Sequence, residues 1–383
     1  MHYALCQILS LCLVVLEPPS LQAQQDSTIA ADSILIRQLQ QEISAPALST
    51  PQSSPRSAPS TNPNMSVIGD VRASYVSPAR RHGDVEFHEA ELALQSVVDP
   101  YARADFFLSV ARDPGGGSFG LDLEEAFLTS LDLPARLQLK AGKFRSTFGK
   151  INTVHPHALS FISAPDAFVR YLGEDGLNDE GLSVSWLVPN PLDFYQELTV
   201  EMTRGPDNNP SFVRSDVDRY LYLGHLKNFW DLTDNATLEL GFSCAAGQNY
   251  SAYATVLGGI DVTYKWKPLQ FNTYQSLVVQ GEAIWSNKRL SGNETVNSWG
   301  MYVLATVQLD RRWFLTGRFD YSNIPTSSSL VERAVAGVLG WYATEFQKIE
   351  LECKGTTSNF SPTVNQVLLR SVFVIGAHGA HAY

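Results

Sequence analysis

The chain has 383 residues, of which 44% are hydrophobic, and its formal net charge is −11. This acidic balance argues against nucleic acid and anionic lipid headgroups as partners. The apolar residues suffice for a large core, but polar residues interrupt them nearly everywhere, which favours alternating patterns over solid apolar blocks.

The first 23 residues are predicted to form a secretory signal peptide. The apolar run Ala4–Leu16 is too short to span a bilayer, and Ala23 supplies a small residue before a polar segment. No later apolar run is long enough for a transmembrane helix. The sequence therefore predicts an exported protein, and any membrane span must use strands.

Two short regions separate this signal from the rest of the chain. Residues 24–44 space some isoleucine and leucine residues as a helix does, but over barely two heptads, so a short coiled coil and a loose partly helical tail both remain open. Residues 45–64 are rich in proline and serine and are predicted to be an extended linker.

Residues 65–383 consist of alternating segments separated by turn signals. In Trp313–Tyr321, for example, Trp313, Leu315 and Phe319 share one face, whereas Arg318 and Asp320 share the other. Period two with one apolar face indicates half-buried strands. About sixteen are expected, beginning near Ser66, Asp84, Tyr101, Gly120, Ala135, Glu180, Phe194, Asp218, Asn235, Ala254, Phe271, Thr295, Trp313, Val331, Lys348 and Thr363.

The connections between these strands favour one architecture. Short turns alternate with longer polar loops on an even number of strands, which is typical of outer-membrane barrels. Hydrocarbon offers no hydrogen-bond partners, so every backbone N–H and C=O group of a spanning sheet must be paired within the protein. The sheet must therefore close on itself. The sequence thus predicts an all-β transmembrane antiparallel barrel in a bacterial outer membrane, in contact with its lipids and with no nucleic acid.

The run "AGKFRSTFGK" (Ala141–Lys150) resembles a segment of the phosphate-selective porin superfamily. This resemblance implies a sixteen-stranded barrel, and a homotrimer. Those relatives line the pore with arginine and lysine, whereas acids predominate on the faces expected to line this lumen, so phosphate specificity is not carried over. The expected lumen acids are Glu89, Glu91, Asp105, Glu197, Glu201, Glu239, Asp261, Glu282, Asp310, Asp320, Glu350 and Glu352, against the bases Arg103, Lys140, Lys265, Arg318, Lys354 and Arg370.

His155 and His157 form the strongest local candidate for a metal site. A zinc site needs three or four protein ligands, and the nearest acids in sequence, such as Asp166, are not constrained by spacing. His378 and His381 are expected at the opposite end of the barrel. A structural or pore-lining role is therefore predicted for the first pair, with no metal and no cofactor. No nucleophile motif indicates an enzyme.

The longest connection, residues 150–179, contains apolar pieces that would be unusual in a solvated surface loop. It is predicted to fold into the lumen and narrow it, with a basic side facing the acidic strands. The predicted constriction and pore-lining residues are Lys140, Lys143, Arg145, Lys150, His155, His157, Arg170, Glu89, Glu91, Asp105, Arg318 and Asp320.

The predicted function is a passive channel for small polar solutes or ions, with a net acidic lumen that favours cations or neutral solutes. The alternative is a non-conducting anchor or adhesin barrel, tethered to the periplasm by residues 24–64. A gated receptor is disfavoured, because that segment is too short and too rich in proline and serine for a plug domain.

Overall fold

The computed structural model describes residues 63–78, 83–112, 118–192, 194–214 and 219–376. The predicted signal peptide, the helical segment and nearly all of the predicted linker lie outside the described residues, as do His378 and His381.

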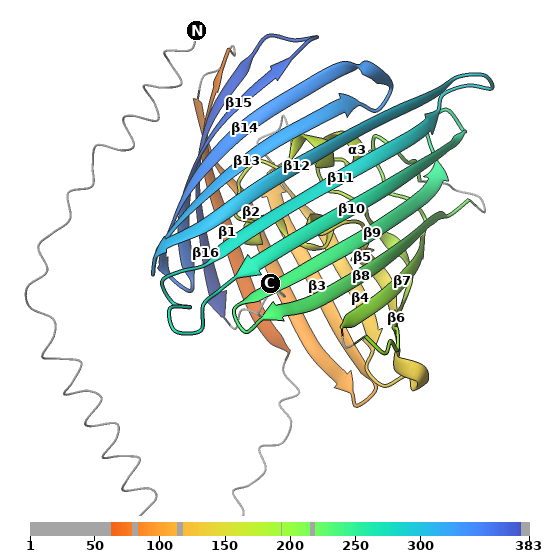
Figure 1. Ribbon diagram of the computed structural model, residues 1–383, viewed down its shortest axis with the longest axis horizontal. Coiled ribbons are helices and arrows are strands. Elements are labelled where there is room, and N and C mark those ends of the chain that lie inside the picture. Colours follow the sequence, from red (N-terminus) through yellow and green to blue (C-terminus); the bar gives the residue numbers. More distant parts are fainter. Residues whose placement is uncertain (1–62, 79–82, 113–117, 193, 215–218, 377–383) are drawn as a thin grey trace, which may run out of the picture. The chain divides into compact units, whose positions relative to one another are not determined.

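Sixteen antiparallel strands form a closed barrel, as the sequence predicted (Figure 1). Closure is completed by β1, which pairs with β2 on one side and with β16 on the other. The strands are β1 (Asn64–Ser77), β2 (Gly83–Asp99), β3 (Ala102–Arg112), β4 (Phe119–Ser130), β5 (Leu137–Arg145), β6 (Asn178–Leu187), β7 (Tyr195–Thr203), β8 (Leu221–Thr233), β9 (Ala236–Gln248), β10 (Ala254–Trp266), β11 (Leu277–Arg289), β12 (Thr295–Asp310), β13 (Trp313–Ile324), β14 (Ser327–Thr344), β15 (Gln347–Ser358) and β16 (Val364–Gly376).

The two faces of the barrel wall differ as the period-two pattern requires. On β13, Trp313 and Leu315 are exposed on the outer face, whereas Thr316, Arg318 and Asp320 are buried on the inner face. An apolar exterior matches hydrocarbon, and a polar interior matches a lumen that holds water or a polar loop. No helix in the described part of the chain is long and apolar enough to cross a membrane.

Two connections differ from the prediction. Strand β11 begins at Leu277 and not near Phe271, because residues 268–275 close local turns in which the Tyr274 and Gln275 amides donate to the Phe271 carbonyl. The expected long loop after β13 is a tight turn, since β14 already begins at Ser327.

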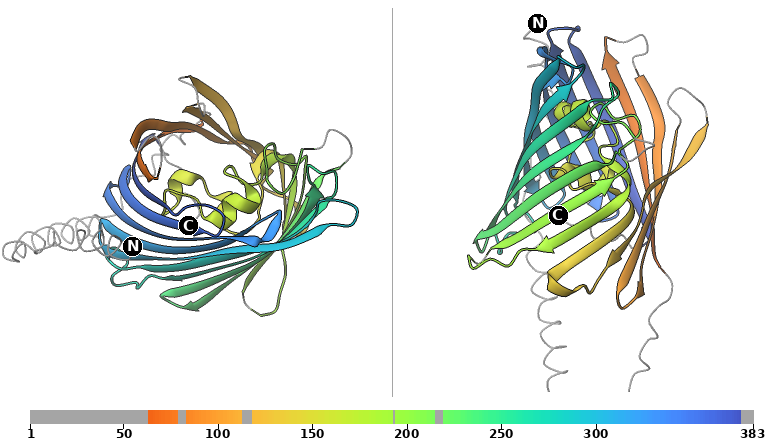
Figure 2. Two further views of the ribbon diagram at one scale, coloured as in Figure 1. Left: turned by 90° about the horizontal axis from the view of Figure 1, so that it is seen from above. Right: turned by 90° about the vertical axis from the view of Figure 1, so that its right-hand side faces the viewer.

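The connection between β5 and β6 lies inside the barrel (Figure 2, left). It contains two short 3-10 turns, η2 (Ile151–Thr153) and η3 (Pro156–Ala158), and the helix α3 (Asp166–Leu172), which packs against β11, β12, β13 and β14. We call residues 146–177 the inner loop.

An apolar core forms between the inner loop and one side of the wall. The loop contributes aromatic and aliphatic side chains that are almost fully buried, and the β7–β8 connection adds Phe212. The main members are Phe148, Ile151, Phe161, Phe168, Tyr171, Leu172, Leu177, Phe212, Leu257, Ile284, Tyr302 and Leu304. These contacts explain the apolar pieces that the sequence shows in this connection.

Gly300 on β12 lies where α3 approaches the wall most closely. A Cβ there would lie 2.9 Å from Ala167 Cβ and 3.0 Å from Tyr171 Cε2, so the Gly300→Val side chain would push α3 away from β12. We expect it to lower the free energy of unfolding by about 1–3 kcal/mol, the usual cost of overpacking, measured by denaturant titration in detergent.

Gly317→Val is the matched control, because nothing lies within 4 Å of a Cβ at Gly317. Equal effects of the two substitutions would contradict the close packing of α3 on β12.

Candidate functional site: the inner loop and the wall that holds it

Carboxylates on the inner wall accept hydrogen bonds from backbone N–H groups at the end of β5 and at the start and middle of the inner loop. They come from β4, β7, β11 and β15, so they reach the chain from several sides of the barrel. The contacts are Arg145 N to Glu125 (3.0 Å), Thr147 N to Glu201 (3.2 Å), Ile151 N to Glu282 (2.9 Å), and Ile162 N and Ser163 N to Glu352 (2.6 and 3.2 Å).

Basic side chains of the wall donate to backbone carbonyls of the same loop. Arg370 is fully buried and donates to the carbonyls of Pro156, Leu159 and Phe161 at 3.0–3.1 Å. It also forms an ion pair of 2.6 Å with Glu350. The loop is thus held through its main chain, at both its donors and its acceptors.

Lysine, arginine and aspartate side chains of the inner loop form ion pairs with the wall at three points. Lys150 lies 2.8 Å from Glu239 on β9, Arg170 lies 2.7 Å from Glu332 on β14, and Asp166 lies 2.5 Å from Lys354 on β15. Lys150 and Arg170 therefore each lie beside a wall carboxylate, which offsets the positive charge of that side chain.

Other predicted site residues lie away from these contacts. The Lys140 ammonium group lies 4.7 Å from the centre of the Phe127 ring, and Lys143 donates to the Leu123 carbonyl. Asp105 pairs with Arg103 at 2.7 Å on β3.

Arg318 and Asp320 form an ion pair of 3.0 Å on β13. This pair lies beside the inner loop, since Arg318 also donates a hydrogen bond of 2.6 Å to the Ser163 carbonyl.

A compact cluster of histidines and glutamates lies where the loop faces β2 and β4. His155 Nδ1 lies 3.0 Å from Glu91 Oε2 and 3.3 Å from Glu124 Oε2, while His155 Nε2 lies 2.9 Å from Glu125 Oε1. The imidazole of His157 stacks on that of His155, with ring centres 5.6 Å apart. We call these five residues the histidine–glutamate cluster.

Burial alone would lower the pKa of His155. The carboxylates of Glu124, Glu125 and Glu91 outweigh this effect, and the pKa of His155 lies well above its usual range. Without another cation, the imidazole therefore carries a positive charge that the carboxylates offset.

A β-bulge explains why Glu124 and Glu125 both belong to this cluster. Phe107 pairs with Glu125 and Leu108 pairs with Leu123, so Glu124 is an extra residue in β4. A bulge redirects a side chain that strict alternation would place on the other face. Sequence analysis missed Glu124 and Glu125 for this reason, and adjacent acids in an otherwise alternating strand are the one signal that it could have used.

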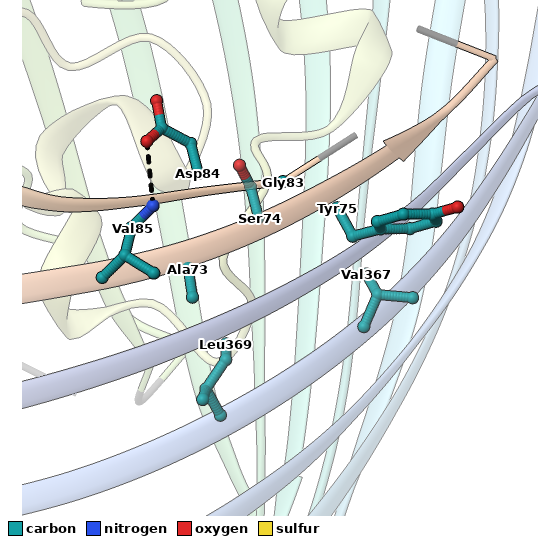
Figure 3. A pocket seen from close by; sticks show the side chains of 8 residues that line it. All are labelled: Ala73, Ser74, Tyr75, Gly83, Asp84, Val85, Val367 and Leu369. Atoms are coloured by element: carbon teal, nitrogen blue, oxygen red, sulfur yellow. Dashed lines mark hydrogen bonds between the residues drawn. The ribbon is translucent and has the colours of Figure 1, made fainter. Parts of the chain in front are cut away.

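A further depression lies on the outer surface and not in the lumen. It has a volume of about 590 Å³ where β1, β2 and β16 meet, and Figure 3 shows Tyr75, Val85, Val367 and Leu369 along it. These four side chains belong to the exposed apolar exterior. The depression therefore faces lipid and adds nothing to the candidate solute pathway.

Solved structures share this fold at low sequence identity. The anion-selective porin of Comamonas acidovorans aligns at a TM-score of 0.59 and 10% identity, over 81% of this chain and 98% of that one. The outer membrane channel DcaP of Acinetobacter baumannii aligns at 0.55 and 12%, over 82% and 96%. The trimer form of OmpT of Vibrio cholerae aligns at 0.53 and 10%, over 82% and 100%. The fold is therefore that of the bacterial outer-membrane porins.

The sequence itself matches no family model. It is 30% identical, over 343 residues, to a protein of Aquifex aeolicus (strain VF5) described only as uncharacterized, and the match covers 77% of this chain and 69% of that protein. The chain belongs to the same family as this Aquifex protein. The resemblance to porins extends to the barrel in general, and none of the comparisons supports phosphate selectivity.

Arg370→Leu tests how the wall holds the loop. The substitution removes three hydrogen bonds to loop carbonyls and leaves the buried Glu350 with Lys348, 3.2 Å away, as its remaining cationic partner among the described residues, so we expect it to lower the free energy of unfolding by about 3–5 kcal/mol. Denaturant titration followed by tryptophan fluorescence measures the change.

Removing both charges with Glu350→Leu and Arg370→Leu together is expected to recover only part of this loss, because the double variant no longer buries Glu350 without Arg370 but deprives the buried Lys348 of its partner Glu350, 3.2 Å away. Arg311→Leu, in an exposed turn, is the control. A loss for Arg370→Leu no larger than the control's would contradict a structural role for these contacts.

Proposed function

We propose that this protein is a passive channel in the bacterial outer membrane for small polar solutes or ions. The carrying observation is the inner loop, which is attached at several points to the inside of a barrel. A sixteen-stranded barrel leaves a lumen too wide for wall side chains to fill. A loop fixed in place by hydrogen bonds and an apolar core narrows that lumen to a defined passage. It does not close the lumen as a plug domain would.

We further propose that the passage is net acidic. The wall bases Arg318, Lys354 and Arg370 each have an acidic partner. In contrast, no ion pair with a described residue involves Glu201 or Asp261, which lie on the inner face of β7 and β10. An excess of fixed negative charge in a narrow, low-dielectric passage favours cations over anions.

A homotrimer fits this function. The solved OmpT structure is described as a trimer form, and the present barrel shares its fold. We propose the same assembly here, with the outer face of the barrel as the surface in contact with lipid and neighbouring subunits.

Conductance in a planar lipid bilayer tests the channel directly. We expect discrete open steps, and a reversal potential in a KCl gradient that has the sign of cation preference, because of the acidic passage. A correctly folded but silent barrel would contradict the channel and favour the non-conducting anchor. Open steps with anion preference would leave the channel intact and contradict the acidic passage.

Shortening the inner loop tests its role as the constriction. Replacement of residues 156–172 by a short glycine–serine linker removes η3 and α3 and the apolar core they form with the wall. We expect a larger single-channel conductance, because the passage widens. Shortening the connection 268–275 is the control, since it lies between strand ends outside the lumen. An unchanged conductance after removal of residues 156–172 would contradict the constriction.

A further inference from the structure

We propose that the histidine–glutamate cluster binds a divalent transition-metal ion of the Zn²⁺ type, with His155, His157, Glu91 and Glu124 as ligands. The site would join the inner loop to β2 and β4. It rests on the geometry of the cluster and not on whether the lumen conducts.

The distances between the proposed donor atoms fit a tetrahedral ion. Zinc binds nitrogen and carboxylate oxygen at about 2.0–2.1 Å, so the edges of its tetrahedron measure about 3.3–3.4 Å. The observed separations from His155 Nδ1 are 3.0 Å to Glu91 Oε2 and 3.3 Å to Glu124 Oε2, and His157 Nδ1 lies 3.5 Å from Glu91 Oε2. Donor atoms of Glu91, His155 and His157 all lie within 4.8 Å of one another. These three ligands need little movement to enclose an ion, and Glu124, 3.3 Å from His155 Nδ1, would be the fourth.

The carboxylate oxygens have lone pairs to offer. Glu91 is 2% exposed; its Oε1 accepts no hydrogen bond within the described part of the chain, and its Oε2 faces the imidazole nitrogens of His155 and His157. Glu124 Oε2 likewise lies 3.3 Å from His155 Nδ1. Buried polar atoms are nearly always satisfied, so such a group calls for an explanation. A metal ion supplies one, since it would accept electron pairs from these oxygens.

The local charge also favours a cation. Glu91, Glu124 and Glu125 surround the histidines, and among the described residues Arg145 is the lysine or arginine paired with them, 3.6 Å from Glu124 and 3.9 Å from Glu125. Burying an excess of negative charge is costly unless a cation accompanies it. A divalent ion offsets that excess within the cluster itself.

The surroundings of His155 match those of a metal-bound imidazole. Its Nε2 lies 2.9 Å from Glu125 Oε1, so Glu125 can orient the ring with Nδ1 directed toward Glu91 and Glu124. Histidines that bind a metal through one ring nitrogen usually donate a hydrogen bond from the other to a carboxylate or a carbonyl. Two imidazoles with carboxylates suit Zn²⁺ better than Mg²⁺ or Ca²⁺, which prefer all-oxygen sites.

The test uses the full chain, purified without a histidine tag and carrying His378→Gln and His381→Gln, so that the C-terminal histidines cannot bind metal. After treatment with chelator, the protein is titrated with ZnCl2 by isothermal calorimetry, and bound zinc is counted by mass spectrometry. We expect one zinc ion per chain, and loss of binding in His157→Gln and Glu91→Gln. Glu125→Gln should bind about 10–100-fold more weakly, because it orients a ligand and is not one.

His225→Gln is the matched control, because His225 is also a buried wall histidine but hydrogen-bonds Ser243 on β9. It should bind zinc as tightly as the parent. Circular dichroism checks the fold of each variant, and Glu124→Gln replaces any variant that does not fold. A folded parent that binds no zinc would overturn the proposal, as would zinc binding that persists in His157→Gln and Glu91→Gln. A barrel that binds zinc but is electrically silent would overturn the channel alone.

Discussion

The inner loop depends on one constraint: its backbone polar groups are enclosed by a barrel whose strands have already paired their own. A buried N–H or C=O group without a partner costs about 1–3 kcal/mol. Neither α3 nor the 3-10 turns are long enough to pair most of the loop internally. The wall solves this with charged side chains, such as Glu352 for the N–H groups of Ile162 and Ser163 and Arg370 for three carbonyls.

This arrangement changes how the charges of the lumen are interpreted. Glu282 accepts hydrogen bonds from Ile151 N and from the Tyr302 hydroxyl, and Glu201 accepts one from Thr147 N. These acids therefore hold the inner loop in place in addition to carrying charge. A count of acids and bases along the strands cannot separate the two roles. The proposed acidic passage would depend on those acids whose field is not cancelled by a neighbouring base or by the N–H groups that donate to them.

The strands could be predicted from the sequence because the wall separates lipid from a polar interior, and that separation repeats every two residues. Prediction failed where a local interaction interrupts the repeat. The aromatic Phe271 was expected to begin a strand but belongs to a turn. Glu124 occupies a β-bulge, which the two-residue alternation of a strand does not indicate. The partners of His155 were also beyond reach, because strand pairing and the inward course of the loop bring Glu91 and Glu125 to it from distant parts of the sequence.

The two sides of the wall hold the loop by different physical means. Toward β11–β15, the loop is fixed by an apolar core, by hydrogen bonds to its backbone, and by the ion pairs of Asp166 and Arg170. Toward β2 and β4, it is held by His155 and His157 against carboxylates, an interaction that depends on which cation, proton or metal, occupies the cluster. The first attachment sets the position of the loop, and the second can be strengthened or weakened by the solution. A change of pH or of bound cation would therefore act directly on the contacts of His155 and His157 and not on the apolar core that α3 forms with the wall.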